Sequence, residues 1–180
     1  MDDPLNLKQY IRTVNDFPIK GIKFRDITSL IETPIAFSKT CKELSKISRD
    51  FKPNIIIGIE SRGFVFAGSI AIDLLIPFVM ARKPNKLPNE TFKIKFELEY
   101  GKTSLEIQKN TKIDSSKNIV VIDDLIATGG TALACSNLLN KNFGVPKENI
   151  LILAVIDLPY LGGSEKIKNF GYKINTLVSY

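Results

Sequence analysis

Four short stretches of this chain are apolar at almost every position, and they restrict the fold more than any other feature. A strand with one face in water alternates apolar and polar residues, whereas a strand covered on both faces does not. The four stretches are NIIIGIE (54–60), PFVMAR (77–82), NIVVID (118–123) and NILILAVID (149–157). We therefore predict strands of a parallel sheet that helices cover on both faces.

Helical patterns lie next to these strands, as a parallel sheet requires. We predict helices through IAFSKTCKELSKI (35–47), through FVFAGSIAIDLL (64–75) and from Ala132 to Phe143. In the last of these helices, Cys135 lies on the apolar stripe. Strands that alternate with helices imply right-handed crossovers and a ligand at the carboxyl ends of the strands. We predict an α/β fold with a mostly parallel, twisted sheet flanked by helices.

One segment departs from this alternation. Between the second and third strands, residues 92–100 alternate between apolar side chains and the charged side chains of lysine and glutamate. This pattern predicts an antiparallel hairpin insertion, with its turn near YGKTS (100–104). The chain has no internal repeat and no interdomain linker, so we predict a single domain over residues 1–180.

The composition limits both the chemistry and the compartment. The net charge of +6 suits an anionic partner, although lysine is abundant throughout the chain. There is no histidine, so a general acid or base must be a carboxylate, lysine, tyrosine or cysteine. Cys41 and Cys135 are far apart in the sequence, and neither a disulfide nor a nucleophile is predicted. Because there is no signal-like N-terminus and no apolar run of roughly 18 residues, we expect a cytoplasmic protein with no membrane partner.

The third strand leads into a motif that can bind a phosphate. Asp123 and Asp124 end the strand, and TGGT (128–131) precedes the helix. Glycines in such a turn let several backbone amides, with a helix N-terminus behind them, point at one anion. Neither a Walker lysine nor the spacing of a dinucleotide-binding loop is present, which disfavours nucleotide hydrolysis and NAD chemistry.

Each half of this motif also has an ordinary explanation. TGGT alone is typical of a tight turn, and an isolated pair of aspartates is typical of a helix cap beside a solvated acid. Neighbours on a strand point to opposite sides, so only one of the two carboxylates faces a given ligand atom. Together, the carboxylates and the turn favour a phosphorylated sugar whose hydroxyl groups donate to the carboxylates.

Basic residues follow the first two strands. Arg62, within ESRGF (60–64), either clamps a second phosphate or is an exposed loop arginine. Between Arg82 and Lys95 there are five basic residues and one acid, and prolines stiffen this loop. The loop suits a mobile lid over an anionic leaving group, with a solvated charge run and a nucleic-acid contact as alternatives. On the hairpin, Glu99 is by pattern an exposed charge, and it becomes a candidate acid or base only if its face overlooks the site.

These segments together resemble the type I phosphoribosyltransferases, and within them the branch that uses adenine. The family signature is matched by IVVIDDLIATGGT (119–131). Four further stretches match in order: FPIKGIKFRDITSL (17–30), ESRGF (60–64), RKPNKLP (82–88) and LEYGKTSLEIQKN (98–110). The resemblance covers nearly the whole chain and implies the fold of that family.

The resemblance also implies a reaction and its participants. Adenine and 5-phosphoribosyl 1-pyrophosphate (PRPP) would give AMP and pyrophosphate, with Mg²⁺ as cofactor, in purine salvage by a homodimer. We expect these small molecules as partners, and no nucleic acid. A base-binding segment would cover about residues 10–32 and a lid and hairpin about 82–110.

Site residues carry over by position in the motifs. The 5-phosphate and ribose would be bound by Asp123, Asp124, Ala127, Thr128, Gly129, Gly130 and Thr131. Pyrophosphate would be bound by Ser61, Arg62, Arg82, Lys83 and Lys86, in part across a dimer interface. Adenine would be bound by backbone near Ile22, by stacking on Phe24 and beside Arg25. Glu99 would be the catalytic carboxylate, Tyr100 its neighbour in the lid, and Asp123 or Asp124 the residue nearest to the metal.

Two alternatives remain open at this point. A regulator could bind the same donor and control transcription or bind RNA, but the sequence has neither a helix-turn-helix extension nor an aromatic-basic RNA motif. An enzyme could instead use hypoxanthine, xanthine or orotate. Asn85 replaces a common glycine of the family in the lid, a mild change because asparagine tolerates left-handed backbone.

Overall fold

A parallel sheet of five strands forms the centre of the protein. The computed structural model describes residues 3–98 and 101–180. The strand order is β4 (Phe78–Ala81), β3 (Ile55–Ile59), β7 (Ile119–Ile126), β8 (Ile150–Asp157) and β9 (Lys173–Ser179), and all neighbouring pairs are parallel. The four apolar stretches form the first four of these strands, as predicted, but β4 is an edge strand that is partly exposed and not covered on both faces. The fifth, β9, was not predicted, because it lies at the edge of the sheet and alternates exposed and half-buried residues along its first half.

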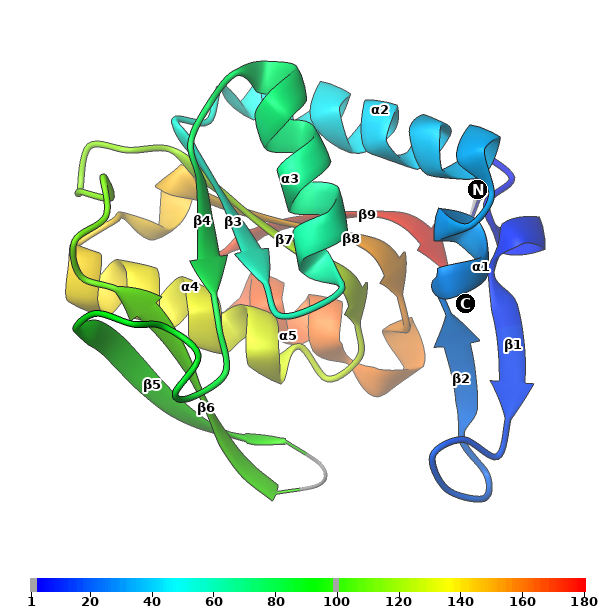
Figure 1. The fold of residues 1–180 in the computed structure, drawn as a ribbon. Coiled ribbons are helices and arrows are strands. Elements are labelled where there is room, and N and C mark those ends of the chain that lie inside the picture. The colour runs from blue at the N-terminus through cyan, green and yellow to red at the C-terminus, as the bar shows by residue number, and fades with distance from the viewer. Residues whose placement is uncertain (1–2, 99–100) are drawn as a thin grey trace.

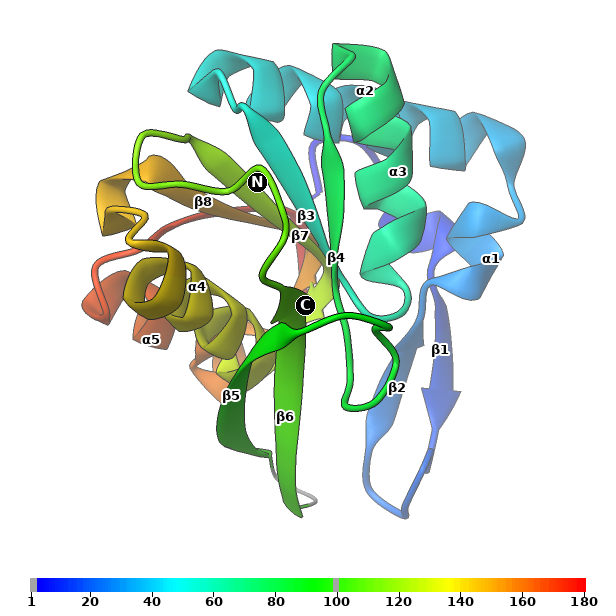
Figure 2. The ribbon, with the colours of Figure 1, turned by 60° about the vertical axis from the view of Figure 1, so that its left-hand side comes forward.

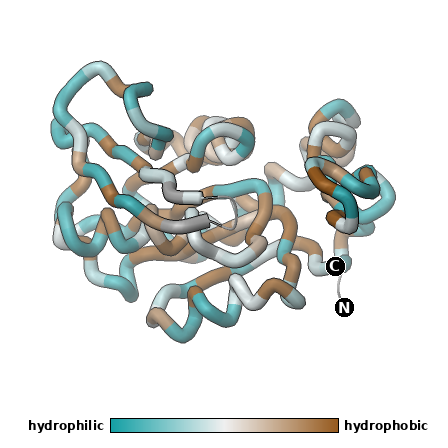
Figure 3. Tube along the Cα trace, turned by 90° about the horizontal axis from the view of Figure 1, so that it is seen from below, coloured by the Kyte–Doolittle hydropathy of each residue, from teal (hydrophilic) through white to brown (hydrophobic). Residues whose placement is uncertain are grey.

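Helices cover both faces of this sheet (Figure 1). On one face lie α2 (Pro34–Phe51) and α3 (Gly63–Leu74), and on the other lie α4 (Gly130–Phe143) and α5 (Gly163–Asn169). Alternate residues of the central strands enter separate cores: Val120 and Ile122 of β7 pack with Phe66 of α3, whereas Val121 packs with Leu138 of α4. This explains the apolar runs in the central strands. Seen from below in Figure 3, the hydrophobic stretches run through the centre and the hydrophilic stretches surround them.

The predicted hairpin is present and packs against α4. Its strands, β5 (Thr91–Leu98) and β6 (Gly101–Gln108), pair antiparallel. The rings of Phe92 and Phe143 meet edge to face with their centroids 5.0 Å apart. The backbone of β6 also bonds to the residue after β4, because Arg82 N donates to Glu106 O (2.9 Å) and Glu106 N donates to Arg82 O (2.7 Å). The hairpin is therefore joined to the sheet at the end of β4.

A second hairpin, which the sequence analysis did not predict, precedes the sheet. It pairs β1 (Arg12–Asn15) with β2 (Lys23–Asp26) and is flanked by the short helices η1 (Lys8–Tyr10) and α1 (Thr28–Ile31). Figure 2 shows both hairpins extending past the carboxyl ends of the parallel strands, one on each side. Two further short helices, η2 (Lys147–Asn149) and η3 (Pro159–Leu161), precede β8 and α5.

Both cysteines lie in the cores, as predicted for Cys135. Cys41 and Cys135 are free thiols and are buried. Burial raises the pKa of the Cys135 thiol far above its ordinary value, so this thiol stays protonated at neutral pH. Within residues 3–98 and 101–180, no helix combines the length and the apolar character needed to cross a membrane.

Candidate functional site

The candidate site lies where the strand order of the sheet reverses. From β3 the chain crosses to β4 on one side, and from β7 it crosses to β8 on the other, so the connections that follow β3 and β7 diverge. In open parallel sheets such a switch point leaves a crevice outside the carboxyl ends of the strands. The predicted ligand position at the carboxyl ends agrees with this topology.

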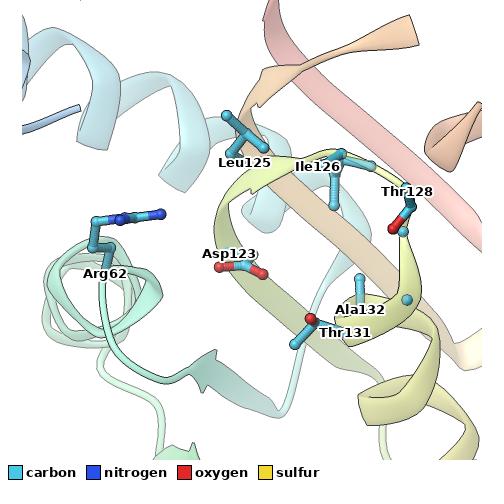
Figure 4. Close-up of a pocket in the computed structure, with 10 residues that line it drawn as sticks. Arg62, Asp123, Leu125, Ile126, Thr128, Thr131 and Ala132 are labelled. Carbon is cyan, nitrogen blue, oxygen red and sulfur yellow. The ribbon is translucent and has the colours of Figure 1, made fainter. Parts of the chain in front are cut away.

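A cavity of about 340 Å³ occupies this position (Figure 4). Its wall consists of Arg62, Asp123 and the continuous segment from Leu125 to Ala132. The segment turns at Gly129, whose φ of +74° is left-handed, and α4 begins at Gly130 rather than at the predicted Ala132. The amides of the TGGT turn and the N-terminus of a 14-residue helix therefore meet at the cavity, an arrangement that suits a phosphate.

The two adjacent aspartates face different layers of the protein. Strand β7 continues to Ile126, so both carboxylates lie inside the strand and not after its end. Asp124 is buried and accepts a hydrogen bond from Arg62 Nε (2.5 Å) at the start of α3. Asp123 lies on the α4 side, where its charge adds to the effect of burial on the pKa of Cys135. The predicted divergence of neighbouring side chains is thus present.

Asp123 is the carboxylate that faces the cavity. Figure 4 shows it between Arg62 on one side and Thr128 and Thr131 on the other. Burial raises the pKa of Asp123 well above its ordinary value, and the neighbouring charge of Asp124 raises it further. Its Oδ1 accepts a hydrogen bond from the backbone N of Asp124 (2.9 Å). A hydroxyl donor or a cation in the cavity would stabilise the ionised form.

A second cavity of about 260 Å³ adjoins the first and shares Arg62, Asp123, Leu125 and Thr131 with it. The rest of its wall comes from β3 and the turn after it, the loop after β4, the two strands of the β5–β6 hairpin, and β7. These residues are Ile59, Glu60, Lys83, Phe96, Thr103, Ser104, Leu105 and Asp124. The hairpin face of β6 therefore overlooks the site. Sequence reasoning missed Thr103 and Ser104, because a hydroxyl on a hairpin strand carries no signal of its own.

The basic loop after β4 is held by Glu60. Glu60 Oε2 accepts hydrogen bonds from Arg82 Nε (3.2 Å) and from the backbone N of Lys83 (2.9 Å), and Arg82 Nη1 donates to Lys86 O (3.0 Å). Burial acts to raise the pKa of Glu60, but these donors hold it below its ordinary value. Asn85 has a φ of +61°, the left-handed backbone that its sequence position suggested. Lys83 and Arg62 bring positive charge to the same cavity.

The N-terminal hairpin brings aromatic residues to the same region. The ring of Phe24 on β2 lies 5.7 Å from the Arg62 guanidinium carbon and meets the ring of Phe17 edge to face, with centroids 5.0 Å apart. Arg25 donates to Thr13 Oγ1 and stacks on the ring of Tyr180, with its Cζ 3.8 Å from the ring centroid. Sequence reasoning missed the contact with Tyr180, because the two residues meet only through packing of β9 near the hairpin.

Of the remaining predicted residues, the structure describes Ser61 and Ile22. Ser61 is exposed in the turn between β3 and α3, next to Arg62. The backbone N of Ile22 donates to Ile19 O (3.3 Å), before β2 begins. Glu99 and Tyr100 lie outside the described residues. In the part of the chain that is described, no group of three or more histidine, cysteine, aspartate or glutamate side chains could hold a metal ion alone.

The arrangement suits a ligand with two anionic ends and hydroxyl groups between them. The amides after Ala127 can bind one anion, and Arg62 and Lys83 can bind another on the far side of Asp123. The carboxylate between them can accept hydrogen bonds from hydroxyl groups. Phe24 offers an aromatic face near Arg62 for a flat group.

Comparisons with known proteins agree with this geometry. The phosphoribosyl transferase domain family matches residues 28–156. An adenine phosphoribosyltransferase from Pelagibacter ubique is 43% identical over 176 residues, which are 98% of this chain and 98% of that protein.

Two solved structures are similar over almost the full chain. APRTase from Giardia lamblia, complexed with 9-deazaadenine, has a TM-score of 0.90 and 34% identity, covering 97% of this chain and 96% of that one. Adenine phosphoribosyltransferase from Saccharomyces cerevisiae has a TM-score of 0.84 and 34% identity, covering 96% of both chains. It is complexed with adenine and with D-2,5-dideoxy-2,5-imino-altritol 1,6-bisphosphate.

Proposed function

The chain belongs to the phosphoribosyltransferase family, in its adenine phosphoribosyltransferase branch, and we propose that it converts adenine and PRPP to AMP and pyrophosphate in purine salvage. The observation that carries this proposal is the pair of adjoining cavities, which share Arg62 and Asp123. An amide-lined turn, a carboxylate and basic groups line these two cavities, and the donor has a phosphate, hydroxyls and a pyrophosphate in that order.

The donor would lie across both cavities. The amides of Ala127, Thr128, Gly129, Gly130 and Thr131 would hold its 5-phosphate, and Asp123 and Asp124 would serve the ribose. Ser61, Arg62, Arg82, Lys83 and Lys86 would hold the pyrophosphate. The guanidinium of Arg82 has five N–H groups, so Arg82 could donate to the ligand while its Nε keeps the hydrogen bond to Glu60.

Adenine would lie between the donor and the N-terminal hairpin. Phe24 would stack on the base, and its distance from Arg62 supports a base placed next to the bound donor. Arg25 would border this position, held by Thr13 and Tyr180. Because the N–H of Ile22 already donates to Ile19, we propose that the carbonyl of Ile22 accepts from the amino group of adenine.

Magnesium fits this site as a partner of the substrate. Mg²⁺ keeps several water molecules and is bound through one or two carboxylates together with substrate phosphates, so a large protein cage is not needed. Asp123, half-buried at the wall of both cavities, has the oxygen chemistry for this role, and Asp124 lies beside it. When bound, the ion would neutralise charge on the pyrophosphate.

The chemistry itself would be a displacement at the anomeric carbon of the ribose. A purine nitrogen forms the new bond as the bond to pyrophosphate breaks, so negative charge grows on the leaving group beside Arg62 and Lys83. We propose that Glu99 handles the proton that the purine loses and that Tyr100 is its neighbour in the lid. Closure would also exclude water, which attacks the same carbon.

We further propose that the active form is a homodimer working in the cytoplasm, with residues 1–180 acting as one domain. An exposed apolar surface on α3 and the edge strand β4 supports the dimer, and Ile72, Leu75 and Met80 contribute to it. A groove lined by Gly68, Ala71, Ile72, Leu75, Ile76 and Phe78 runs along this surface. Exposed apolar surfaces of this kind mark contacts with another protein.

The experiment that tests the function is a substrate screen. The protein is incubated with Mg²⁺, PRPP and one base at a time, and nucleotide and pyrophosphate are measured. We expect turnover with adenine, and none when Mg²⁺ is chelated. Turnover only with hypoxanthine, xanthine or orotate would replace the acceptor, and PRPP binding without turnover of any base would identify a sensor of the donor.

The role of Phe24 predicts a selective loss of affinity for the base. Phe24→Ala should raise the KM for adenine about tenfold or more, since stacking on an aromatic side chain contributes about 1–3 kcal/mol per base. The KM for PRPP should change far less. Steady-state kinetics with each substrate varied in turn measure both, and Phe170→Ala, at an exposed position after α5, is the control. Equal changes in both KM values would remove Phe24 from the base site.

If the proposed apolar surface forms the dimer interface, a charge placed on it should lower the mass of the protein in solution from that of a dimer to that of a monomer. Ile72 has 76% of its surface exposed on α3, and Ile35 has 73% exposed on α2. Ile72→Glu should shift the protein from dimer to monomer in size-exclusion chromatography with light scattering, because a dimer would have to bury the new charge. Ile35→Glu should remain dimeric. A dimer that survives both substitutions would place the interface elsewhere.

A further inference from the structure

The turn that begins α5 lies directly against the predicted phosphate loop. A Cβ atom added to Gly163 would lie 2.1 Å from the carbonyl oxygen of Ala127 and 2.6 Å from the backbone N of Gly129. In the opposite direction, a Cβ on Gly129 would lie 2.8 Å from Gly163 O. Two backbones therefore touch here without any side chain between them.

Several contacts hold this turn in place. Asp157, at the end of β8, is buried and accepts a hydrogen bond from Ser164 Oγ (2.8 Å). The next residue, Leu158, donates its backbone N–H to Ile126 O (3.0 Å) at the end of β7. Lys166 N donates to Gly162 O (2.9 Å), which closes the first turn of α5. The turn and the phosphate loop thus extend from the same pair of bonded strands.

We propose that Gly163 is a positioning residue for the phosphate loop. It is not among the residues that line the cavity, so it acts through the loop and not on the ligand. Its bare Cα lets the anchored turn support the segment from Ala127 to Gly129, which fixes the direction of the loop amides. This inference rests on the proposed function, in which those amides bind the 5-phosphate of PRPP.

Any side chain at position 163 would have to move one of the two backbones. The atoms it would meet are backbone atoms of the loop, which cannot rotate away as the end of a side chain does. Hydrogen bonds from amides to a phosphate depend on both distance and angle. A displaced loop should therefore lose affinity for the phosphate end of the donor and retain its affinity for adenine.

The test compares Gly163→Ala with Gly162→Ala. Gly162 has a φ of +73° and open space around its Cα, so alanine there strains the backbone without pressing on the loop. Affinities for ribose 5-phosphate are measured by calorimetry, KM values for PRPP and adenine by kinetics, and folding by thermal unfolding. We expect Gly163→Ala to weaken ribose 5-phosphate binding and raise the KM for PRPP by about tenfold or more, as misplacements near 1 Å do. The KM for adenine should stay within about twofold of wild type, and Gly162→Ala should leave ligand affinity unchanged.

Ser164→Ala provides a second route if Gly163→Ala does not fold. It removes the hydrogen bond to Asp157 without adding bulk, and it should raise the KM for PRPP severalfold while sparing adenine. Wild-type affinity for ribose 5-phosphate in folded Gly163→Ala would overturn the positioning role alone. Equal losses in the Gly162 and Gly163 variants would overturn it as well. A wild-type chain that binds neither ribose 5-phosphate nor PRPP would instead overturn the proposed function, and the positioning role with it.

Discussion

Replacing Arg62 by methionine should lower the kcat/KM for PRPP about a hundredfold or more. The variant loses a cation at the wall shared by both cavities, and it leaves the Asp124 carboxylate buried without the partner that now donates to it. A hydrogen bond to a charged group contributes about 1.5–3 kcal/mol, and a buried charge without its partner costs more. Methionine keeps an unbranched apolar stem, so the substitution removes the guanidinium and its contact with the ring of Phe24 but leaves the base of the side chain in place.

The matched control for this prediction is Arg49→Met. Arg49 forms an ion pair with Asp73 (3.0 Å) between α2 and α3, but the side chains of both residues are largely exposed. Exposed pairs contribute about 0–1 kcal/mol, so this variant should keep wild-type kinetics and stability. Steady-state kinetics and thermal unfolding of both variants provide the comparison. If Arg62→Met and Arg49→Met behave alike, the Arg62 guanidinium has no part in donor binding.

Asp123→Asn should reduce activity and increase stability at the same time. Asparagine retains a carbonyl oxygen for the backbone N of Asp124 but loses the negative charge that would bind the ribose hydroxyls and approach Mg²⁺. We expect kcat/KM for PRPP to fall about a hundredfold, the effect of losing 2–3 kcal/mol of charged contact. Removal of a charge that burial and Asp124 both disfavour should raise the Tm by about 2–4 °C for each kcal/mol recovered.

The pH dependence of stability distinguishes this explanation from a general improvement in packing. The pKa of Asp123 is higher in the folded chain than in the unfolded chain, so the folded state binds more protons in that interval. The free energy of unfolding should therefore fall as the pH rises from about 3.9, the unfolded value, through the raised folded value. Asp123→Asn should lack this decline.

Denaturant unfolding between acid and neutral pH measures the difference between wild type and variant. Asp73→Asn is the matched control, because Asp73 is exposed and makes only a surface ion pair. Stability of Asp123→Asn that is below wild type at neutral pH would show that the carboxylate is compensated in the native protein. In that case its charge would already be neutralised without a ligand.

Strands could be predicted where the sequence has an apolar run, which follows from burial in three of them and occurs in β4 although that edge strand is partly exposed. Strands β3, β7 and β8 are almost entirely buried, so each contains a run of apolar residues by which it could be recognised. Strand β9 at the edge and the β1–β2 hairpin have mixed exposure, and no run or period distinguishes them. The β5–β6 hairpin was recognisable because one of its faces packs against α4, which imposes alternation.

The candidate site also has a part that could be predicted from the sequence and a part that could not. A phosphate loop needs only consecutive residues, so the motif from Asp123 to Thr131 could be read locally, as could Arg62 in its turn. Thr103 and Ser104, the support from Gly163 and the stacking of Arg25 on Tyr180 join segments that are distant in the sequence. No local pattern encodes such contacts.

The sequence by itself determined the class of fold, the location of four of the parallel strands along the chain and the presence of a turn suited to a phosphate. It could do so because apolar runs, helical periods and glycine-containing turns act over a few neighbouring residues. Only the tertiary structure decided that Asp124 pairs with Arg62 while Asp123 faces the cavity, and that Gly163 lies against the loop. These outcomes depend on which side of the sheet each residue faces and on which strands become neighbours, and both are set by the packing of the whole chain.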